Sequence, residues 1–112
     1  MNLSELAPAP TKSDAFRRQR ERFIPEQPGC YVLTTFEREV MYVGLAKNLR
    51  RRFNQHLDND QKTAVTGLGR AIFFWWLEAE DINKIERTWM NIHIQHEGGL
   101  PLLNKVYSPT PV

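Results

Sequence analysis

The first candidate for chemistry is a pair of basic residues beside the apolar stripe of a predicted helix. From Leu49 onward, apolar residues recur at steps of four, a spacing typical of an amphipathic helix. At about 100° per residue, Arg52 and His56 fall within roughly 60° of Leu49, so both border the buried side. An arginine at such a border usually has an anionic partner, which is either an acidic residue of the protein or an anionic ligand.

The second candidate is a carboxylate on the apolar stripe of another predicted helix. Glu86 falls about 40° from Ile82 around the helix axis, on the same side as Trp89. Burying a carboxylate there is costly unless it meets a cation. A salt bridge to Arg52 within the protein explains the position, and so does a bound metal ion.

Two tyrosines form the third candidate. Tyr31 and Tyr42 lie on two predicted strands, each close to a glycine, Gly29 and Gly44. A glycine in a strand lets another backbone or a ligand approach closely. Strand tyrosines are also common for packing alone, so both explanations stay open.

Two further groups carry weaker signals. His93 and His96, together with Glu97, have spacing that permits a metal site, although a histidine near an apolar stripe is more often packed. Trp75 and Trp76 are able to stack nucleic acid bases, but in an apolar strand at least one of them is expected in the core.

The elements that must position these residues follow from the periodicity of the chain. Two neighbouring stretches rich in β-branched and aromatic residues predict an antiparallel hairpin, and a continuous apolar run predicts a third strand. Asn48 and Asp81 are plausible caps of the two helices. The order indicates an α+β fold, a small three-stranded antiparallel sheet flanked by helices. The predicted strands are 29–35, 40–44 and 71–77, and the predicted helices are 45–57 and 81–96.

The start of the chain has a different pattern. It contains Pro8 and Pro10 and little periodicity, which indicates a mobile arm, and Ser13 or Asp14 is positioned to cap a short basic helix through Arg22. The predicted organisation is an arm with a short basic helix at 1–23, one domain at 24–107 and a tail at 108–112.

Composition narrows the class of protein. The chain has 112 residues and a single cysteine, Cys30, so no intramolecular disulfide is possible. The first ten residues do not form a signal peptide, and no apolar run approaches the length of a membrane span. We therefore expect an intracellular, cytoplasmic protein without a membrane partner.

The distribution of charge is informative, although the net charge is only +2. Between Lys12 and Arg70 there are 12 Lys/Arg and 7 Asp/Glu, whereas residues 71–112 hold 3 and 5. A localised basic surface suits a polyanion such as nucleic acid. A solvated basic face is the alternative, and it applies also to the arginines of the predicted first helix.

Taken together, the candidate residues resemble the GIY-YIG nuclease family. One segment closely resembles the nuclease domain at the start of excinuclease C, which acts in DNA repair. The resemblance covers about residues 24–106, with Cys30 in the isoleucine place of the first signature. The matching segments are 29–31 (GCY), 42–44 (YVG), 46–53 (AKNLRRRF), 85–86 (IE) and 100–104 (LPLLN).

The resemblance implies hydrolysis of nucleic acid phosphodiester bonds, with DNA as the expected substrate. Glu86 would be the sole protein ligand of one Mg²⁺ or Mn²⁺ ion. Tyr31 or Tyr42 would act as general base or position the attacking water, and His56 would lie close to that water. Arg52 would hold the scissile phosphate and stabilise its transition state.

Other residues would position the site or bind the nucleic acid. Gly29, Gly44 and Asn104 match structural positions of the family. The basic residues expected to contact phosphates away from the cut bond are Lys47, Arg50, Arg51, Arg17 and Arg18.

The sequence departs from the family pattern in two places. Leu45 stands where excinuclease C has a lysine, and the stretch between Glu86 and Asn104 is longer, through residues 95–100. Loss of the lysine keeps a second hypothesis open, in which the chain binds nucleic acid or a partner protein without cutting. The shared retention of both tyrosines, Arg52 and Glu86 favours the nuclease, whose site choice would come from DNA structure or a protein partner.

Overall fold

The fold is built on an antiparallel sheet with the strand order β1-β4-β2-β3. The structure is a computed structural model that describes residues 1–105; residues 106–112, including the predicted tail, lie outside the described part. The predicted α+β class is confirmed, but the sheet has a fourth strand that was not predicted. The strands are β1 (Lys12–Ala15), β2 (Gly29–Thr34), β3 (Val40–Ala46) and β4 (Phe73–Glu78).

The register of the central strands decides which side chains share a face. Tyr31 of β2 pairs with Gly44 of β3 on one side and with Trp76 of β4 on the other. Side chains two residues apart along a strand point to the same face, so Tyr42 lies on the same face as Tyr31. The predicted hairpin is thus confirmed, and it brings the two tyrosines together.

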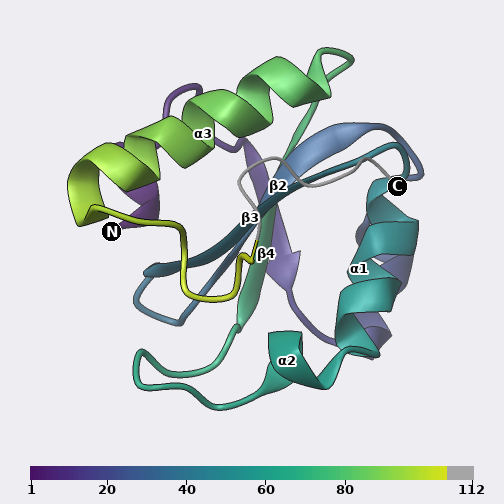
Figure 1. The fold of residues 1–112 in the computed structure, drawn as a ribbon. Coiled ribbons are helices and arrows are strands. Elements are labelled where there is room, and N and C mark those ends of the chain that lie inside the picture. Colours follow the sequence, from purple (N-terminus) through teal and green to yellow (C-terminus); the bar gives the residue numbers. More distant parts are fainter. Residues whose placement is uncertain (106–112) are drawn as a thin grey trace.

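Helices cover both faces of the sheet (Figure 1). Helix α1 (Leu49–Leu57) packs on the face that carries Tyr31, Leu33 and Phe74, and helix α3 (Ile82–Glu97) packs on the opposite face. A short helix α2 (Asp60–Thr63) follows α1. In β2, Cys30 and Val32 belong to the α3 side, so the alternation of the strand divides the core into two clusters.

The helix ends agree with the sequence in part. The Asn48 side chain accepts a hydrogen bond of 3.0 Å from the Arg51 N–H, which confirms the predicted cap of α1. Helix α1 begins four residues later than predicted because Leu45 and Ala46 continue β3. Asp81 precedes α3 but makes no capping hydrogen bond, so its predicted capping role is wrong.

The helix predicted from Ser13 or Asp14 through Arg22 is also wrong. Lys12–Ala15 forms β1 along the free side of β4, and Arg18–Phe23 forms a 3₁₀ helix, η2. The open edge of an apolar strand favours pairing over solvent exposure, a tertiary effect that outweighs local helix propensity. The Asp14 carboxylate binds Arg20 at 2.6 and 3.1 Å and fixes the turn between strand and helix.

The start of the chain is anchored to the domain by three buried side chains, those of Met1, Leu3 and Leu6, whereas a mobile arm was expected. Leu3, in the short helix η1 (Leu3–Glu5), and Leu6 are buried in the α3-side cluster. The Trp89 indole N–H donates to the Pro8 carbonyl at 2.8 Å. The arm therefore completes the core on that face. Within the described residues, no helix has the length and apolarity needed to cross a bilayer.

Candidate active site

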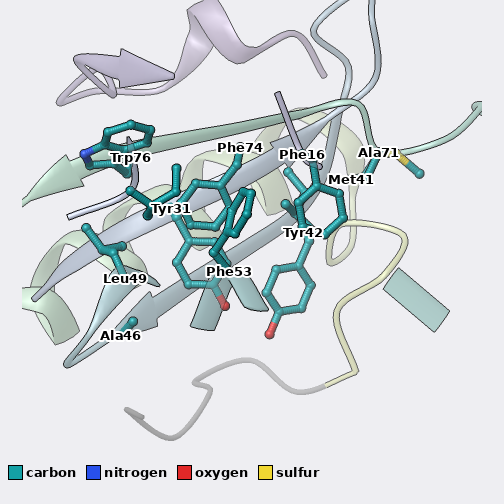
Figure 2. Close-up of a cluster of buried hydrophobic side chains, with 12 residues drawn as sticks. Phe16, Tyr31, Met41, Tyr42, Ala46, Leu49, Phe53, Ala71, Phe74 and Trp76 are labelled. Carbon is teal, nitrogen blue, oxygen red and sulfur yellow. The ribbon is translucent and has the colours of Figure 1, made fainter. Parts of the chain in front are cut away.

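The centre of the site is a hydrogen bond between a strand and a helix. Tyr31, fully buried on β2, places its hydroxyl 2.6 Å from Nε2 of His56 on α1. Its ring lies between those of Phe74 and Tyr42, with centroid distances of 5.0 and 5.9 Å. Figure 2 shows the hydroxyl ends of Tyr31 and Tyr42 leaving this aromatic cluster in the same direction. The two phenols and the imidazole thus form one polar group at the border of the core.

The two signature glycines are explained by close approach. A Cβ on Gly44 would lie 2.5 Å from Cζ of Tyr31 and 2.8 Å from Cε1 of Tyr42. A Cβ on Gly29 would lie 2.6 Å from the carbonyl oxygen of Leu77 and 2.9 Å from Leu49 Cδ1. All four distances are too short for a residue with a side chain at either position. Gly44 therefore makes room for the tyrosine pair, and Gly29 for the neighbouring strand.

Positive charge surrounds the tyrosine pair. The charge of Arg52, half-buried on α1, favours ionisation of both Tyr31 and Tyr42 and disfavours protonation of His56. Lys62 of α2 is only 8% exposed, and its ammonium lies 4.8 Å from the centroid of the Tyr42 ring. Lys62 was not singled out from the sequence, where it lies outside the predicted strands and helices.

Burial and these cations set the protonation states. Burial, together with the charges of Arg52 and Lys62, lowers the pKa of His56 to about 3, so the imidazole is neutral at physiological pH. Burial raises the pKa of Tyr31 well above its usual value of 10.0. Burial also raises the pKa of Tyr42, and this rise is opposed by the Tyr31 hydroxyl and by Arg52. Tyr42 retains 8% of its surface in contact with solvent, whereas Tyr31 retains none.

The Glu86 carboxylate has no hydrogen-bond partner among the described residues. It is 1% exposed on α3, and among the described residues neither carboxylate oxygen has a hydrogen bond. Burial raises its pKa to about 7, against the opposing charge of Arg87. The charge of Glu86 raises the pKa of Tyr42 and of Cys30, so its field reaches the tyrosine site. A salt bridge from Glu86 to Arg52, one of the two explanations offered by the sequence, is not among the ion pairs of the described residues.

Such a carboxylate fits a hard cation. A buried acceptor with two unused oxygens gains most from a divalent ion, which takes its other ligands from water and phosphate. The described residues hold no cluster of three His, Cys, Asp or Glu side chains able to bind a metal. The chain therefore offers one carboxylate rather than a complete protein cage.

Asn104 fixes the strand that carries Tyr42. Its side-chain oxygen accepts from the Val43 N–H at 2.9 Å, and its side-chain nitrogen donates to the Val43 carbonyl at 2.8 Å. Because β3 is an edge strand, these groups of Val43 have no neighbouring strand on that side. Asn104 thus replaces a strand partner between Tyr42 and Gly44.

The predicted nucleic-acid contacts separate into two groups. Arg17, Lys47 and Arg51 are exposed on the surface. Arg50 donates to the carbonyls of Ile24 at 2.9 Å and Arg22 at 3.2 Å, which ties α1 to η2. Arg18 forms an ion pair with Asp58. The structural contacts of Arg50 and Arg18 were not foreseen from the sequence.

The weaker candidates have structural explanations. His93 is buried and its Nδ1 lies 2.7 Å from the Gly99 carbonyl oxygen, while His96 Nε2 lies 3.5 Å from Glu5 Oε2. Trp76 is buried in the core, and the Trp75 indole donates to Thr34 Oγ1 at 2.9 Å.

Comparison with known proteins identifies a matching family model and similar proteins. The model of the GIY-YIG catalytic domain matches residues 27–97. UvrABC system protein C of Limosilactobacillus fermentum is 27% identical over 103 residues, covering 80% of this chain and 17% of that protein. The same protein of Porphyromonas gingivalis is 44% identical over 62 residues, covering 51% of this chain and 10% of that protein. The chain thus spans less than a fifth of these relatives.

A solved structure shares the fold. It is the N-terminal GIY-YIG endonuclease domain of UvrC from Thermotoga maritima, a point mutant bound to its catalytic divalent cation. The TM-score is 0.55 at 19% identity, and the match covers 80% of this chain and 94% of that domain. The tyrosine pair flanking Gly44, the buried Glu86 and the match over residues 27–97 lead to one conclusion: this protein belongs to the GIY-YIG catalytic domain family.

Proposed function

We propose that this protein is a divalent-metal-dependent nuclease that hydrolyses phosphodiester bonds of DNA. The observation that carries the proposal is the buried Glu86 carboxylate, which has no hydrogen-bond partner among the described residues and whose field reaches Tyr42. A structural role alone gives little reason to keep an unpartnered carboxylate in a core. The catalytic cation named for the Thermotoga maritima domain supports the same interpretation.

Glu86 holds the metal, which we propose to be Mg²⁺ or Mn²⁺. When bound, such an ion acts as a Lewis acid that stabilises charge on phosphate and leaving-group oxygens. Because a single carboxylate supplies the protein ligand, the remaining positions of the ion stay open to water and phosphate.

The general base is Tyr42 rather than Tyr31. Tyr31 is fully buried and its hydroxyl already contacts His56, whereas Tyr42 reaches solvent and lies among the cations Arg52 and Lys62. An ordinary tyrosine is a weak base at neutral pH, so positive charge nearby is required. Tyr42 reacts as its phenolate, a form that the charge of Arg52 favours, and Tyr31 with neutral His56 orders its oxygen. It accepts the proton of the attacking water and becomes a neutral phenol. The water oxygen then forms the new bond to phosphorus as the bond to the leaving oxygen breaks, and the leaving oxygen takes up a proton from solvent.

Arg52 stabilises the phosphate during this displacement. It sits half-buried beside both phenols, where a fixed guanidinium is effective against the added negative charge of the transition state. Arg17, Lys47 and Arg51 contact phosphates away from the cut bond and supply binding without sequence readout.

The relatives suggest where such a nuclease acts. They are named as components of the UvrABC system, and this chain corresponds to a small part of each. We propose a role in cytoplasmic DNA processing such as repair, with site choice supplied by DNA structure or by a protein partner.

The test uses purified protein with supercoiled plasmid and branched DNA, in Mg²⁺ or Mn²⁺. Wild type is expected to cut, and Glu86→Gln, which keeps the shape of the side chain, is expected to lose at least about 10³-fold in kcat, as removal of a charge-stabilising group typically does. Mn²⁺ binding measured by calorimetry gives a second readout, which should disappear in the variant. Normal DNA binding without cutting on any substrate would instead support the second hypothesis, in which the chain binds nucleic acid or a partner protein without cutting.

A further inference from the structure

Lys62, a mostly buried lysine near Tyr42, has no acidic partner among the described residues. Lys62 is 8% exposed, and within the described residues its ammonium forms no ion pair with a carboxylate. Instead, the ammonium lies over the face of the Tyr42 ring, 4.8 Å from its centroid. Buried charges are normally paired, so this arrangement favours an anion beside the ammonium, and the described residues supply none.

Hydrogen bonds of the turn through Asn59 fix the backbone position of Lys62. The Asn59 N–H donates to the His56 carbonyl at 3.1 Å, and the Asn59 carbonyl accepts from the Lys62 N–H at 3.0 Å. The Asn59 side chain caps the same turn by accepting from Gln61 at 2.9 Å. The end of α1 thus directs Lys62 toward the tyrosine pair.

Like charges converge on this point from three parts of the chain. Burial lowers the pKa of Lys62, and the nearby charges of Lys105 and Arg52 lower it further. His56 adds no charge, because its pKa is lowered to about 3. Glu86 acts on Tyr42 from α3 but is not among the groups that affect Lys62. The two other cations therefore repel the Lys62 ammonium, and a bound anion beside it would compensate that repulsion.

We infer that Lys62, together with Lys105 and Arg52, binds a phosphodiester group of the nucleic acid beside the tyrosine pair. The inference rests on the proposed function for the identity of the ligand, but binding of an anion at Lys62 is testable with inorganic phosphate. It assigns two lysines from outside the signature motifs to substrate binding. An ammonium acts as a compact point charge, which suits a phosphate oxygen that moves as the strand is positioned.

The test measures binding in EDTA, where no cutting occurs. For Lys62→Met and for Lys105→Met, affinity for a short DNA duplex at low salt is expected to fall about 5- to 10-fold, and the slope of log K against log salt to decrease by about 1. Lys62→Arg should retain most of the affinity because it keeps the charge. Lys84→Met, which removes an exposed lysine of α3, is the matched control and should bind like wild type.

A second readout needs no nucleic acid. Inorganic phosphate should shift the NMR signals of the Tyr42 ring in wild type and not in Lys62→Met, with thermal unfolding confirming that the variant is folded. Unchanged DNA affinity and salt slope in Lys62→Met, or a loss of kcat alone, would overturn the inference. If phosphate binds at Lys62 but no DNA is bound or cut, the proposed function is wrong, whereas anion binding at Lys62 is confirmed.

Discussion

Tyr31 and Glu86 are both buried polar residues, on opposite faces of the sheet, but they differ in their hydrogen bonding. On the α1 face, Tyr31 is bonded to His56 and packed between aromatic rings. On the α3 face, Glu86 is equally buried but has no hydrogen-bond partner among the described residues. Tyr31 therefore has its partner within the fold, whereas the charge of Glu86 is not compensated by any described hydrogen bond. The difference separates groups that the protein preorganises from a group whose partner must come from outside.

This contrast has an energetic consequence that mutations can measure. Changes to the packed aromatic rings or to the Tyr31–His56 hydrogen bond of the α1 face should remove favourable contacts and destabilise the fold. Neutralising Glu86 should relieve an unfavourable charge in the metal-free protein. The expected signs on stability are therefore opposite, although changes on either face should reduce activity.

After Glu86→Gln, the largest effect on kcat is expected for Arg52→Gln. Loss of the guanidinium removes charge stabilisation at the phosphate, so kcat should fall about 10²- to 10³-fold while the free energy of unfolding changes little. Single-turnover cleavage of a labelled duplex, with Arg87→Gln on α3 as the control, gives the measurement. An equal loss in both variants would show that Arg52 has no special place in the site.

Gly44→Ala should destabilise the α1 face strongly. Its new Cβ would overlap the Tyr31 ring, and relief requires the tyrosine pair to move, at a cost of about 3 kcal/mol. Urea unfolding gives the free energy, and Gly67→Ala, where a Cβ meets nothing within 4 Å, is the control. A cost below about 0.5 kcal/mol would mean that the tyrosines are not held by this contact.

Glu86 should give stability an unusual dependence on pH. Its folded pKa of about 7 lies above the ordinary value of 4.5, so the folded state binds more protons between these values. Its contribution is full below pH 4.5 and is lost as pH rises through about 7, amounting to about 3 kcal/mol. The lowered pKa of His56 acts in the opposite direction at acid pH, so the difference between wild type and Glu86→Gln isolates the carboxylate.

The measurement is chemical unfolding of metal-free protein from pH 5 to pH 8. Relative to wild type, Glu86→Gln should become progressively more stable as pH rises. A difference that stays constant across this range would show that Glu86 is ionised throughout and already compensated, and the contrast between the faces would disappear.

The smallest effect is expected for Tyr31→Phe. The ring packing stays, but His56 Nε2 loses its only described hydrogen bond, which costs about 1–2 kcal/mol. Urea unfolding beside Tyr42→Phe makes the comparison, because Tyr42 keeps solvent contact and should cost less. A larger loss in Tyr42→Phe would reverse the assignment of the structural and the reactive tyrosine.

The sequence by itself determined the hairpin, both long helices and the placement of His56 and Glu86 on buried helix faces. These features follow from local periodicity, since spacing along a helix or strand fixes the face on which a residue lies. The motif resemblance supplied the family, which the comparison of residues 27–97 confirmed.

Only the tertiary structure decided what depends on contacts between distant segments. Residues 12–15 became a strand because β4 offered a free edge, and Met1, Leu3 and Leu6 became part of the core on the α3 face. Likewise, Arg50 is tied to the backbone near η2, and Lys62 points at Tyr42. Such outcomes depend on which surfaces meet after folding, and no local pattern of residues encodes that meeting.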